Sequence, residues 1–227
     1  MRTVIFDLDG TLADTSGDLL AAANCCFADM DMQVRLRPET DAGVALRGGR
    51  AMLSLGIERE TGKAAEQAIL DAQYQPLIEH YERAIDVHTQ LYDGAMDAIE
   101  QLRSDGFAVG ICTNKPEHLA ELLMTKLGVR DAFASLIGAD TLPVRKPDPE
   151  PFFEAVRRAG GNTQRSCLIG DTLTDHSTAR AAGVPSVLVT FGPGAAAGQA
   201  DIRALEPDAL LDHYRDLPAI VAELLGD

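Results

Sequence analysis

The sequence predicts an α/β fold, a Rossmann-like, doubly wound parallel sheet with an inserted α-helical domain. From about residue 94 onward, short apolar runs alternate with segments of helical periodicity. The apolar runs are continuous, which is typical of parallel strands covered on both faces. Residues 16–88 show helical periodicity and no convincing strand. We therefore expect a core domain formed by 1–15 and 89–227, and a helical cap domain at 16–88.

The core elements follow in chain order, beginning with the apolar run VIF at 4–6. We expect later strands at FAVGIC (107–112), SLIG (135–138), SCLIG (166–170) and PSVLVT (185–190), and helices at 94–105, 116–127, 149–160 and 174–182. Each strand segment is a short apolar run, and each helical segment repeats apolar residues every three or four positions. Pro116 suits a first helical turn, and Gly106 and Gly183 suit helix ends. The small residues at 192–200 predict a loop.

The composition favours a soluble enzyme. The chain has 227 residues, 46% of them hydrophobic, and 35 acidic against 20 basic side chains give a net charge of −15. A surface this acidic repels nucleic acid and anionic membranes, so we expect neither as a partner. No apolar run reaches the roughly 18 residues of a membrane span, and the first strand begins too early for a signal peptide. We expect a cytoplasmic protein, either monomer or homodimer, that acts on a small molecule.

Polar side chains follow the predicted strands at the point where each strand ends. They are Asp7 and Asp9 after the first strand, Thr113 and Asn114 after the second, and Asp171 and Asp175 after the fourth. Ligands of open parallel sheets bind at this edge. Lys146 lies in a proline-rich loop before the fourth strand, where restricted backbone suits an aimed side chain; an ordinary solvated loop lysine is the alternative.

Carboxylates gathered at one edge repel each other unless a cation lies among them. At 4 Å and an effective dielectric constant of 20, one such pair costs about 4 kcal/mol. Oxygen ligands with no nearby histidine or cysteine favour a hard cation, and Mg²⁺ suits a site that also takes phosphate oxygens. Threonine and asparagine beside backbone amides, with a lysine opposite, can hold a phosphate group. The pattern therefore predicts Mg²⁺-dependent chemistry on a phosphate ester, with Asp7 attacking phosphorus.

These motifs resemble the haloacid dehalogenase superfamily. DLDGT at 7–11, ICTNK at 111–115, KPDP at 146–149 and GDTLTD at 170–175 match its four motifs in order. The resemblance covers the whole chain, and within the superfamily it is greatest to the phosphoglycolate phosphatase family. It implies a phosphatase with a mobile cap, formed here by the helical insert.

The resemblance also implies a role for each motif residue. Asp7 is the nucleophile that becomes an aspartyl phosphate, and Asp9 is the acid and then the base. Thr113 and Asn114 hold the phosphoryl group, and Lys146 stabilises its charge. The implied metal site is formed by Asp7, the main-chain carbonyl of Asp9, Asp171 and, directly or as support, Asp175.

The substrate is less determined than the reaction. The insert departs from the family pattern around RGGRAML at 47–53. We hypothesise that Arg47, Arg50 or both pair with the far end of a phosphorylated acid such as 2-phosphoglycolate; arginines facing water are the alternative. A sugar-phosphate phosphatase and a phosphosugar mutase also fit the core motifs. A receiver-like signalling domain fits poorly, because it needs no helical insert, and nothing points to a fold without activity.

Overall fold

The computed structural model describes residues 1–192 and 202–226, so the loop expected at 192–200 lies outside them except for Gly192. The chain forms two compact units. The core unit comprises Met1–Ala13 and Leu91–Asp227, and the helical unit comprises Asp14–Gln90. Both boundaries lie two residues from the predicted ones, inside two short strands that pair with each other, β2 (Ala13–Asp14) and β3 (Gln90–Leu91).

The core unit contains a six-stranded sheet in which every neighbouring pair is parallel. The strands, in spatial order, are β5 (Ser135–Ile137), β4 (Ala108–Cys112), β1 (Thr3–Phe6), β6 (Ser166–Gly170), β7 (Ser186–Val189) and β8 (Ala209–Leu211). The order reverses at β1, which lies between β4 and β6. This is the doubly wound order of the Rossmann fold, and its binding site lies where the order reverses, at the carboxyl ends of the central strands.

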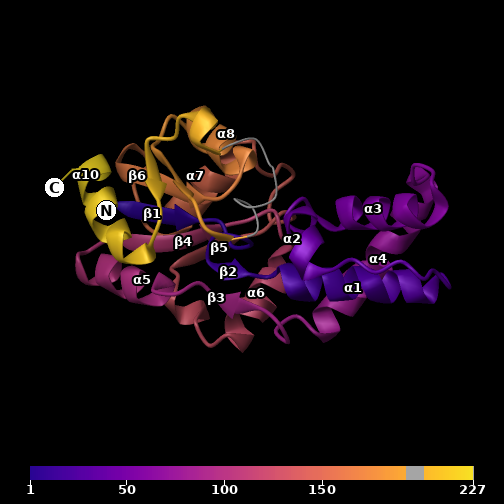
Figure 1. Ribbon diagram of the computed structural model, residues 1–227. Helices are drawn as coiled ribbons and strands as arrows, with labels where there is room; N and C mark the ends of the chain where they lie inside the picture. The colour runs from indigo at the N-terminus through magenta and orange to yellow at the C-terminus, as the bar shows by residue number, and fades with distance from the viewer. Residues whose placement is uncertain (193–201, 227) are drawn as a thin grey trace. The chain divides into compact units, whose positions relative to one another are not determined.

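Helices cover both faces of this sheet (Figure 1). The core helices are α5 (Ala95–Ser104), α6 (Glu117–Lys126), α7 (Glu150–Arg158), α8 (Leu173–Ala182) and α10 (Leu217–Leu225). The pair α7 and α8 packs against β1, β4, β5, β6 and β7, while α5 packs with α10 and against β4. Since both faces are covered, β1, β4, β5, β6 and β7 are buried throughout, as their continuous apolar sequence predicts, whereas the edge strand β8 is partly exposed.

The prediction of the fold class is confirmed, and the predicted strands and helices form within two residues of their expected bounds. Two elements near the C-terminus were missed, β8 and α10. A three-residue strand leaves too short an apolar run to recognise, and β8 forms only because β7 offers it an edge. Cys112 and Cys167 are buried in the sheet, and burial raises the pKa of each thiol to about 12.

The helical unit packs four helices around its own apolar core. They are α1 (Ser16–Asp29), α2 (Pro38–Ala45), α3 (Gly49–Thr61) and α4 (Gln67–Arg83). α1 lies against the other three. Its close approach to α3 requires Gly56, because a Cβ there would lie 2.0 Å from the ring of Phe27. No described helix, in either unit, is both long and apolar enough to cross a membrane.

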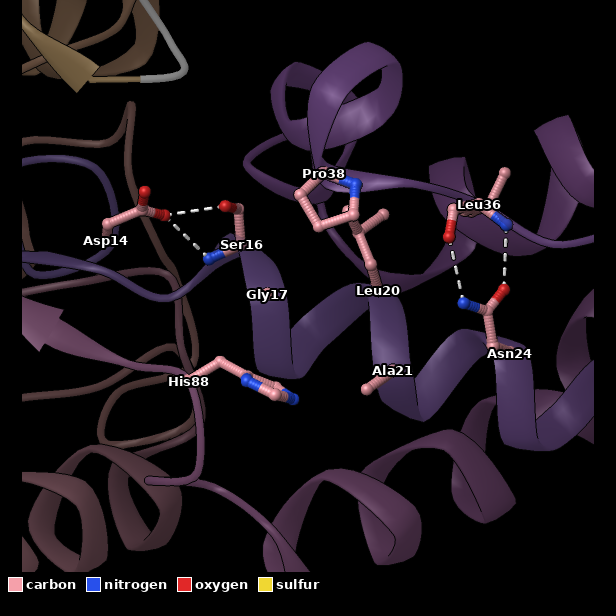
Figure 2. A pocket seen from close by; sticks show the side chains of 9 residues that line it. All are labelled: Asp14, Ser16, Gly17, Leu20, Ala21, Asn24, Leu36, Pro38 and His88. Atoms are coloured by element: carbon pink, nitrogen blue, oxygen red, sulfur yellow. Dashed lines mark hydrogen bonds between the residues drawn. The ribbon is translucent and has the colours of Figure 1, made fainter.

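The helical unit also contains a pocket of about 370 Å³ beside α1 (Figure 2). Its wall includes Leu20, Ala21 and Pro38, and the side chain of His88 lies along one edge. At one end, Asp14 accepts hydrogen bonds from the hydroxyl and main-chain N–H of Ser16, at 2.6 and 3.0 Å. None of the nine lining residues is an arginine or lysine, so this pocket offers a phosphorylated acid no permanent positive charge.

Candidate active site

Asp7 lies where β1 leaves the sheet. Its main-chain N–H donates to the carbonyl of Ile169 in the neighbouring β6, at 2.8 Å. The chain then turns sharply, so that the carbonyl of Leu8 accepts the N–H of Leu12 at 2.9 Å. Gly10 has φ of +82°, a conformation that other residues rarely adopt. The glycine of the DLDGT segment thus allows the turn that holds Asp7 at the edge of the sheet.

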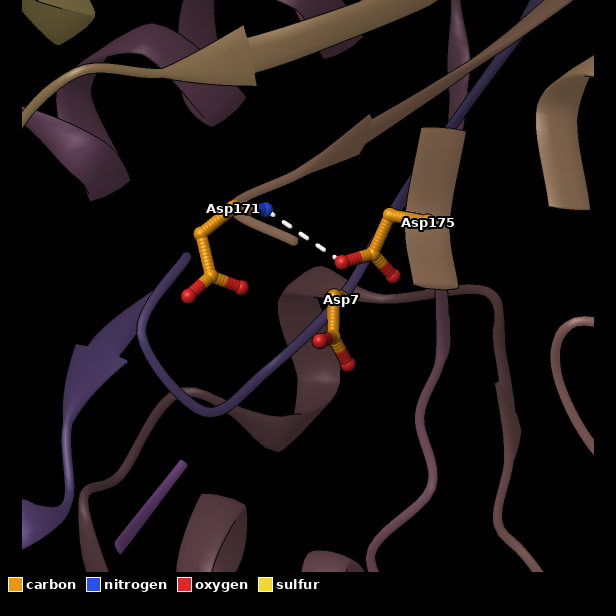
Figure 3. A group of neighbouring side chains, drawn as sticks. All are labelled: Asp7, Asp171 and Asp175. Atoms are coloured by element: carbon orange, nitrogen blue, oxygen red, sulfur yellow. Dashed lines mark hydrogen bonds between the residues drawn. The ribbon is translucent and has the colours of Figure 1, made fainter. Parts of the chain in front are cut away.

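Three carboxylates meet at this edge. Ligand atoms of Asp7, Asp171 and Asp175 lie within 4.8 Å of one another (Figure 3). Asp171 follows β6 directly, and Asp175 lies in the first turn of α8, where it accepts the N–H of Thr172 at 3.1 Å in a capping box. Gly170 makes room for this turn, because a Cβ there would lie 2.2 Å from that of Asp175. The cluster therefore depends on residues that also start the helix.

Lys146 supplies the positive charge of the cluster. Its ammonium lies 2.6 Å from Asp175 Oδ1 and 3.0 Å from Asp7 Oδ1, and the residue is 3% exposed. The side-chain amide of Asn114 donates to the main-chain carbonyl of Lys146 at 3.0 Å. The loop lysine and the end of β4, 32 residues apart, are thereby joined at the same edge of the sheet.

Burial and charge change the pKa values of these groups. Burial raises the pKa of Asp7 from 3.8 to about 6; Lys146 opposes the rise, while Asp175 and Asp9 add to it. Burial, with the charges of Asp175 and Asp7, holds the pKa of Asp171 well above its usual range. Burial alone would lower the pKa of Lys146, but the charges of Asp175 and Asp7 outweigh it and raise the pKa. The cluster as described has more negative charge than its buried lysine neutralises.

The donor set fits a hard divalent cation. Two buried oxygens, Asp7 Oδ1 and Asp171 Oδ2, accept no hydrogen bond from any described residue, although the Lys146 ammonium lies close to the first. Buried polar atoms are rarely left in this state. All three grouped side chains are carboxylates, the ligands that Mg²⁺ prefers over histidine or thiolate.

Thr113 and Asn114, the residues predicted to hold the phosphoryl group, directly follow β4. Thr113 is 3% exposed, and its hydroxyl oxygen accepts the main-chain N–H of Lys115 at 3.2 Å. Asn114 is exposed to solvent, and its side-chain amide donates to the main-chain carbonyl of Lys146. The structure thus brings Thr113 and Asn114 to the edge of the sheet that carries Asp7, as expected from strands that are parallel and adjacent.

Three further contacts at this edge were not predicted. The Lys115 ammonium lies 2.9 Å from Asp9 Oδ1, with 3% of the lysine side chain exposed. The hydroxyl of Tyr214 donates to the main-chain carbonyl of Thr11 at 2.6 Å, and the Thr11 hydroxyl donates to Asp171 Oδ1 at 3.3 Å. Lys115 belongs to the ICTNK segment, directly after Thr113 and Asn114, and this position was the available signal. Tyr214 lies 203 residues from Thr11, and no local pattern connects them.

Arg47 and Arg50 lie in the helical unit, and both are exposed. The Arg50 guanidinium pairs with Asp71 of α4 and lies 4.9 Å from the ring centroid of Tyr74. The hydrogen bond from Arg50, with a second one from Gln67, lowers the pKa of Asp71. Arg47 is followed by Gly48, whose φ is +94°. Of the two arginines, Arg50 is therefore engaged within its own unit.

The raised pKa of Asp7 predicts a pH dependence of stability for the metal-free protein. A carboxyl that binds its proton more tightly when folded loses stabilisation as the pH rises from its unfolded value, 3.8, to its folded value, about 6. We expect the unfolding free energy of wild type to fall relative to Asp7→Asn over this range. The full shift corresponds to about 3 kcal/mol, of which about 2 kcal/mol is lost between pH 4.5 and pH 7. Urea unfolding of both proteins in chelator at pH 4.5 and 7 checks this, and a difference independent of pH would contradict it.

Comparisons with known proteins agree with this geometry. Residues 4–189 match the family of haloacid dehalogenase-like hydrolases. A phosphoglycolate phosphatase from Mesorhizobium japonicum is 37% identical, covering 98% of this chain and 95% of the relative. One from Agrobacterium fabrum is 35% identical, covering 98% and 93%. A solved structure described as a predicted phosphoglycolate phosphatase, from Haemophilus somnus, has the same fold, with a TM-score of 0.82, 22% identity and 97% of each chain covered.

Proposed function

The chain belongs to the haloacid dehalogenase-like hydrolase family and is a phosphatase, and we propose that it hydrolyses phosphate monoesters through an aspartyl phosphate on Asp7. The observation that carries the proposal is the cluster of Asp7, Asp171 and Asp175 around the buried Lys146. An Asp7 carboxylate beside an ammonium can approach an anionic phosphate without the full cost of like-charge repulsion.

The chemistry proceeds in two steps. An Asp7 oxygen bonds to phosphorus as the bond from phosphorus to the alkoxide breaks, and Asp9 gives its proton to the departing oxygen. Asp9, now a carboxylate, takes a proton from water, whose oxygen attacks the same phosphorus. Inorganic phosphate leaves, Asp7 is regenerated, and Asp9 holds a proton again. Thr113 and Asn114 would hold the phosphoryl oxygens during both steps, and Lys146 would balance their charge.

A divalent cation, Mg²⁺ by the chemistry of the donors, would be held by Asp7, Asp171 and the main-chain carbonyl of Asp9. It would neutralise part of the negative charge on the carboxylates and on the phosphate oxygens. Both Asp175 oxygens already accept hydrogen bonds, from the Lys146 ammonium and from the hydroxyl of Thr172. We therefore assign Asp175 to supporting Lys146 and the Asp171 loop, and the direct carboxylate ligands to the other two aspartates.

Removing divalent metal should abolish turnover. After exhaustive chelation, we expect release of phosphate from an aryl phosphate to fall to the level of the Asp7→Asn variant, because the buried carboxylates then face the substrate without compensation. Added Mg²⁺ should restore the rate, whereas Ca²⁺, which favours more and longer oxygen ligands, should restore less. Full activity in chelator would contradict the metal assignment while leaving the nucleophile to be tested separately.

The names of the relatives favour a small phosphorylated acid, 2-phosphoglycolate in the first instance, as the substrate of this protein. Two relatives covering 98% of this chain are named phosphoglycolate phosphatases. We propose that the helical unit serves as the cap and recognises the end of the substrate remote from the phosphate. A panel of phosphorylated acids, sugars and nucleotides, ranked by kcat/KM, tests this, and an assay for isomerised sugar phosphate tests for mutase activity.

Arg47 and Arg50 should differ in their effect on this recognition. Arg50 is engaged by Asp71 and Tyr74, so Arg47 is the freer candidate for binding a substrate carboxylate. We expect Arg47→Ala to raise KM for 2-phosphoglycolate by about tenfold, the loss of one charge-assisted contact, and to leave KM for an aryl phosphate without a carboxylate unchanged. Arg50→Ala is the matched variant. Unchanged KM for 2-phosphoglycolate in both would remove arginine from substrate recognition.

A further inference from the structure

Two of the four lysines in the sequence are buried beside the aspartates of the DLDGT segment. The Lys146 ammonium lies 3.0 Å from Asp7 Oδ1, and the Lys115 ammonium lies 2.9 Å from Asp9 Oδ1. The side chains of these lysines are 2% and 3% exposed, respectively. Burying an ammonium is costly unless a charged partner compensates. The mechanism above uses Lys146 and leaves Lys115 without a role.

Lys115 is held on both sides of its Cα atom. Its N–H donates to the Thr113 hydroxyl oxygen at 3.2 Å, and its carbonyl accepts the N–H of Ala139, beyond β5, at 2.9 Å. Gly138 allows this approach, since a Cβ there would lie 2.4 Å from the backbone of Glu117. With the backbone anchored and the side chain buried, the ammonium is a fixed point in the core unit.

Asp9 is the more exposed partner of this ion pair. It lies in the turn made by Gly10, and 19% of its side chain is exposed. A partly exposed carboxylate side chain can change rotamer, whereas proton transfer requires it to stay within hydrogen-bond reach of the reacting oxygen. A fixed ammonium at 2.9 Å from one carboxylate oxygen restricts that rotation.

We propose that Lys115 is a positioning residue that holds the Asp9 carboxyl in place for proton transfer. This rests on the proposed role of Asp9 as acid and base. With Oδ1 paired to the Lys115 ammonium, Oδ2 carries the proton, which passes to the alkoxide oxygen as its bond to phosphorus breaks. Lys146 cannot replace Lys115 in this task, because its ammonium already contacts Asp7 and Asp175.

The dependence of rate on the leaving group tests the proposal. An alkoxide needs a proton as it leaves phosphorus, whereas p-nitrophenolate leaves readily without one. In Lys115→Met, which keeps the length and removes the charge, we expect kcat/KM for an alkyl phosphate such as 2-phosphoglycolate to fall about 100-fold. For p-nitrophenyl phosphate we expect a fall below about fivefold, because positioned acid catalysis contributes little there. Asp9→Asn should show the same contrast between substrates.

Controls separate positioning from a general loss of structure. Lys115→Arg keeps the charge and should recover most of the alkyl-phosphate rate, while Lys126→Met, on the exposed end of α6, should behave as wild type. If Lys115→Met does not fold, Lys115→Gln serves the same comparison. The role of Lys115 would be overturned if Asp9→Asn shows the contrast between substrates but Lys115→Met lowers kcat/KM equally for both esters or for neither. A wild type that hydrolyses neither ester would instead overturn the proposed function.

Discussion

Replacement of Asp7 by asparagine is expected to reduce phosphate release by at least about 10⁴-fold, the scale seen when a nucleophile is removed. An amide cannot act as the nucleophile that forms the covalent phosphoryl intermediate. The rate of phosphate release from an aryl phosphate in Mg²⁺ is the measurement. Incubation of wild type with substrate followed by rapid acid quench should also show one labile phosphoryl group on Asp7.

The same variant should remain folded, since a neutral amide removes a charge that burial disfavours. Asp97→Asn is a suitable control, because Asp97 is an exposed aspartate in the first turn of α5 and should retain full activity. If Asp7→Asn kept even a tenth of the wild-type rate, the covalent mechanism would be excluded, and direct attack of water on the ester would become the better account.

Replacement of Lys146 by methionine is expected to damage both stability and activity. Removing one partner from a buried ion pair costs about 3–5 kcal/mol, because the remaining charges are left without compensation. Here the remaining charges are Asp7 and Asp175, each within 3.0 Å of the ammonium. We expect the variant to lose stability on this scale in chelator, measured by urea unfolding, and to lose about 10²- to 10³-fold in kcat.

Mg²⁺ should recover part of the lost stability of Lys146→Met, since it would compensate Asp7, one of the two carboxylates that lose their partner, but should recover little of the lost activity. Lys126→Met is the matched control, because its exposed side chain predicts a change within about 0.5 kcal/mol. A Lys146→Met protein as stable as wild type in chelator would mean that the carboxylates are already neutralised by protonation, and the role of the lysine would have to be revised.

The gathering of the candidate site residues at one edge could be predicted because parallel strands bring distant segments together there. Asp7, Thr113 and Asp171 are far apart in the sequence, yet each follows the end of a strand, and β1 pairs with both β4 and β6. The prediction needed only the direction of the strands and their order, which continuous apolar runs and short connections constrain. Lys146 was harder, since it lies in a loop and not at a strand end; its proline-rich surroundings were the signal.

Other contacts could not be predicted because they depend on how side chains from separate elements pack. The pairing of Arg50 with Asp71 joins two helices of the insert, and the sequence pattern around Arg50 suggested only an arginine beside glycines. The hydrogen bond from Tyr214 to the Thr11 carbonyl joins the C-terminal segment to the turn after β1. Neither contact follows from periodicity, which reports the face of an element and not its partner.

The amino-acid sequence by itself determined the layered α/β core, the position of the helical insert and the edge at which the acidic residues gather, because hydrophobic periodicity and turn residues act over a few neighbouring positions. The tertiary structure alone decided which charges compensate one another: Lys146 between Asp7 and Asp175, and Lys115 beside Asp9. The physical reason is range, since an ion pair of about 3 Å requires atoms to be placed more closely than any spacing along the chain can specify.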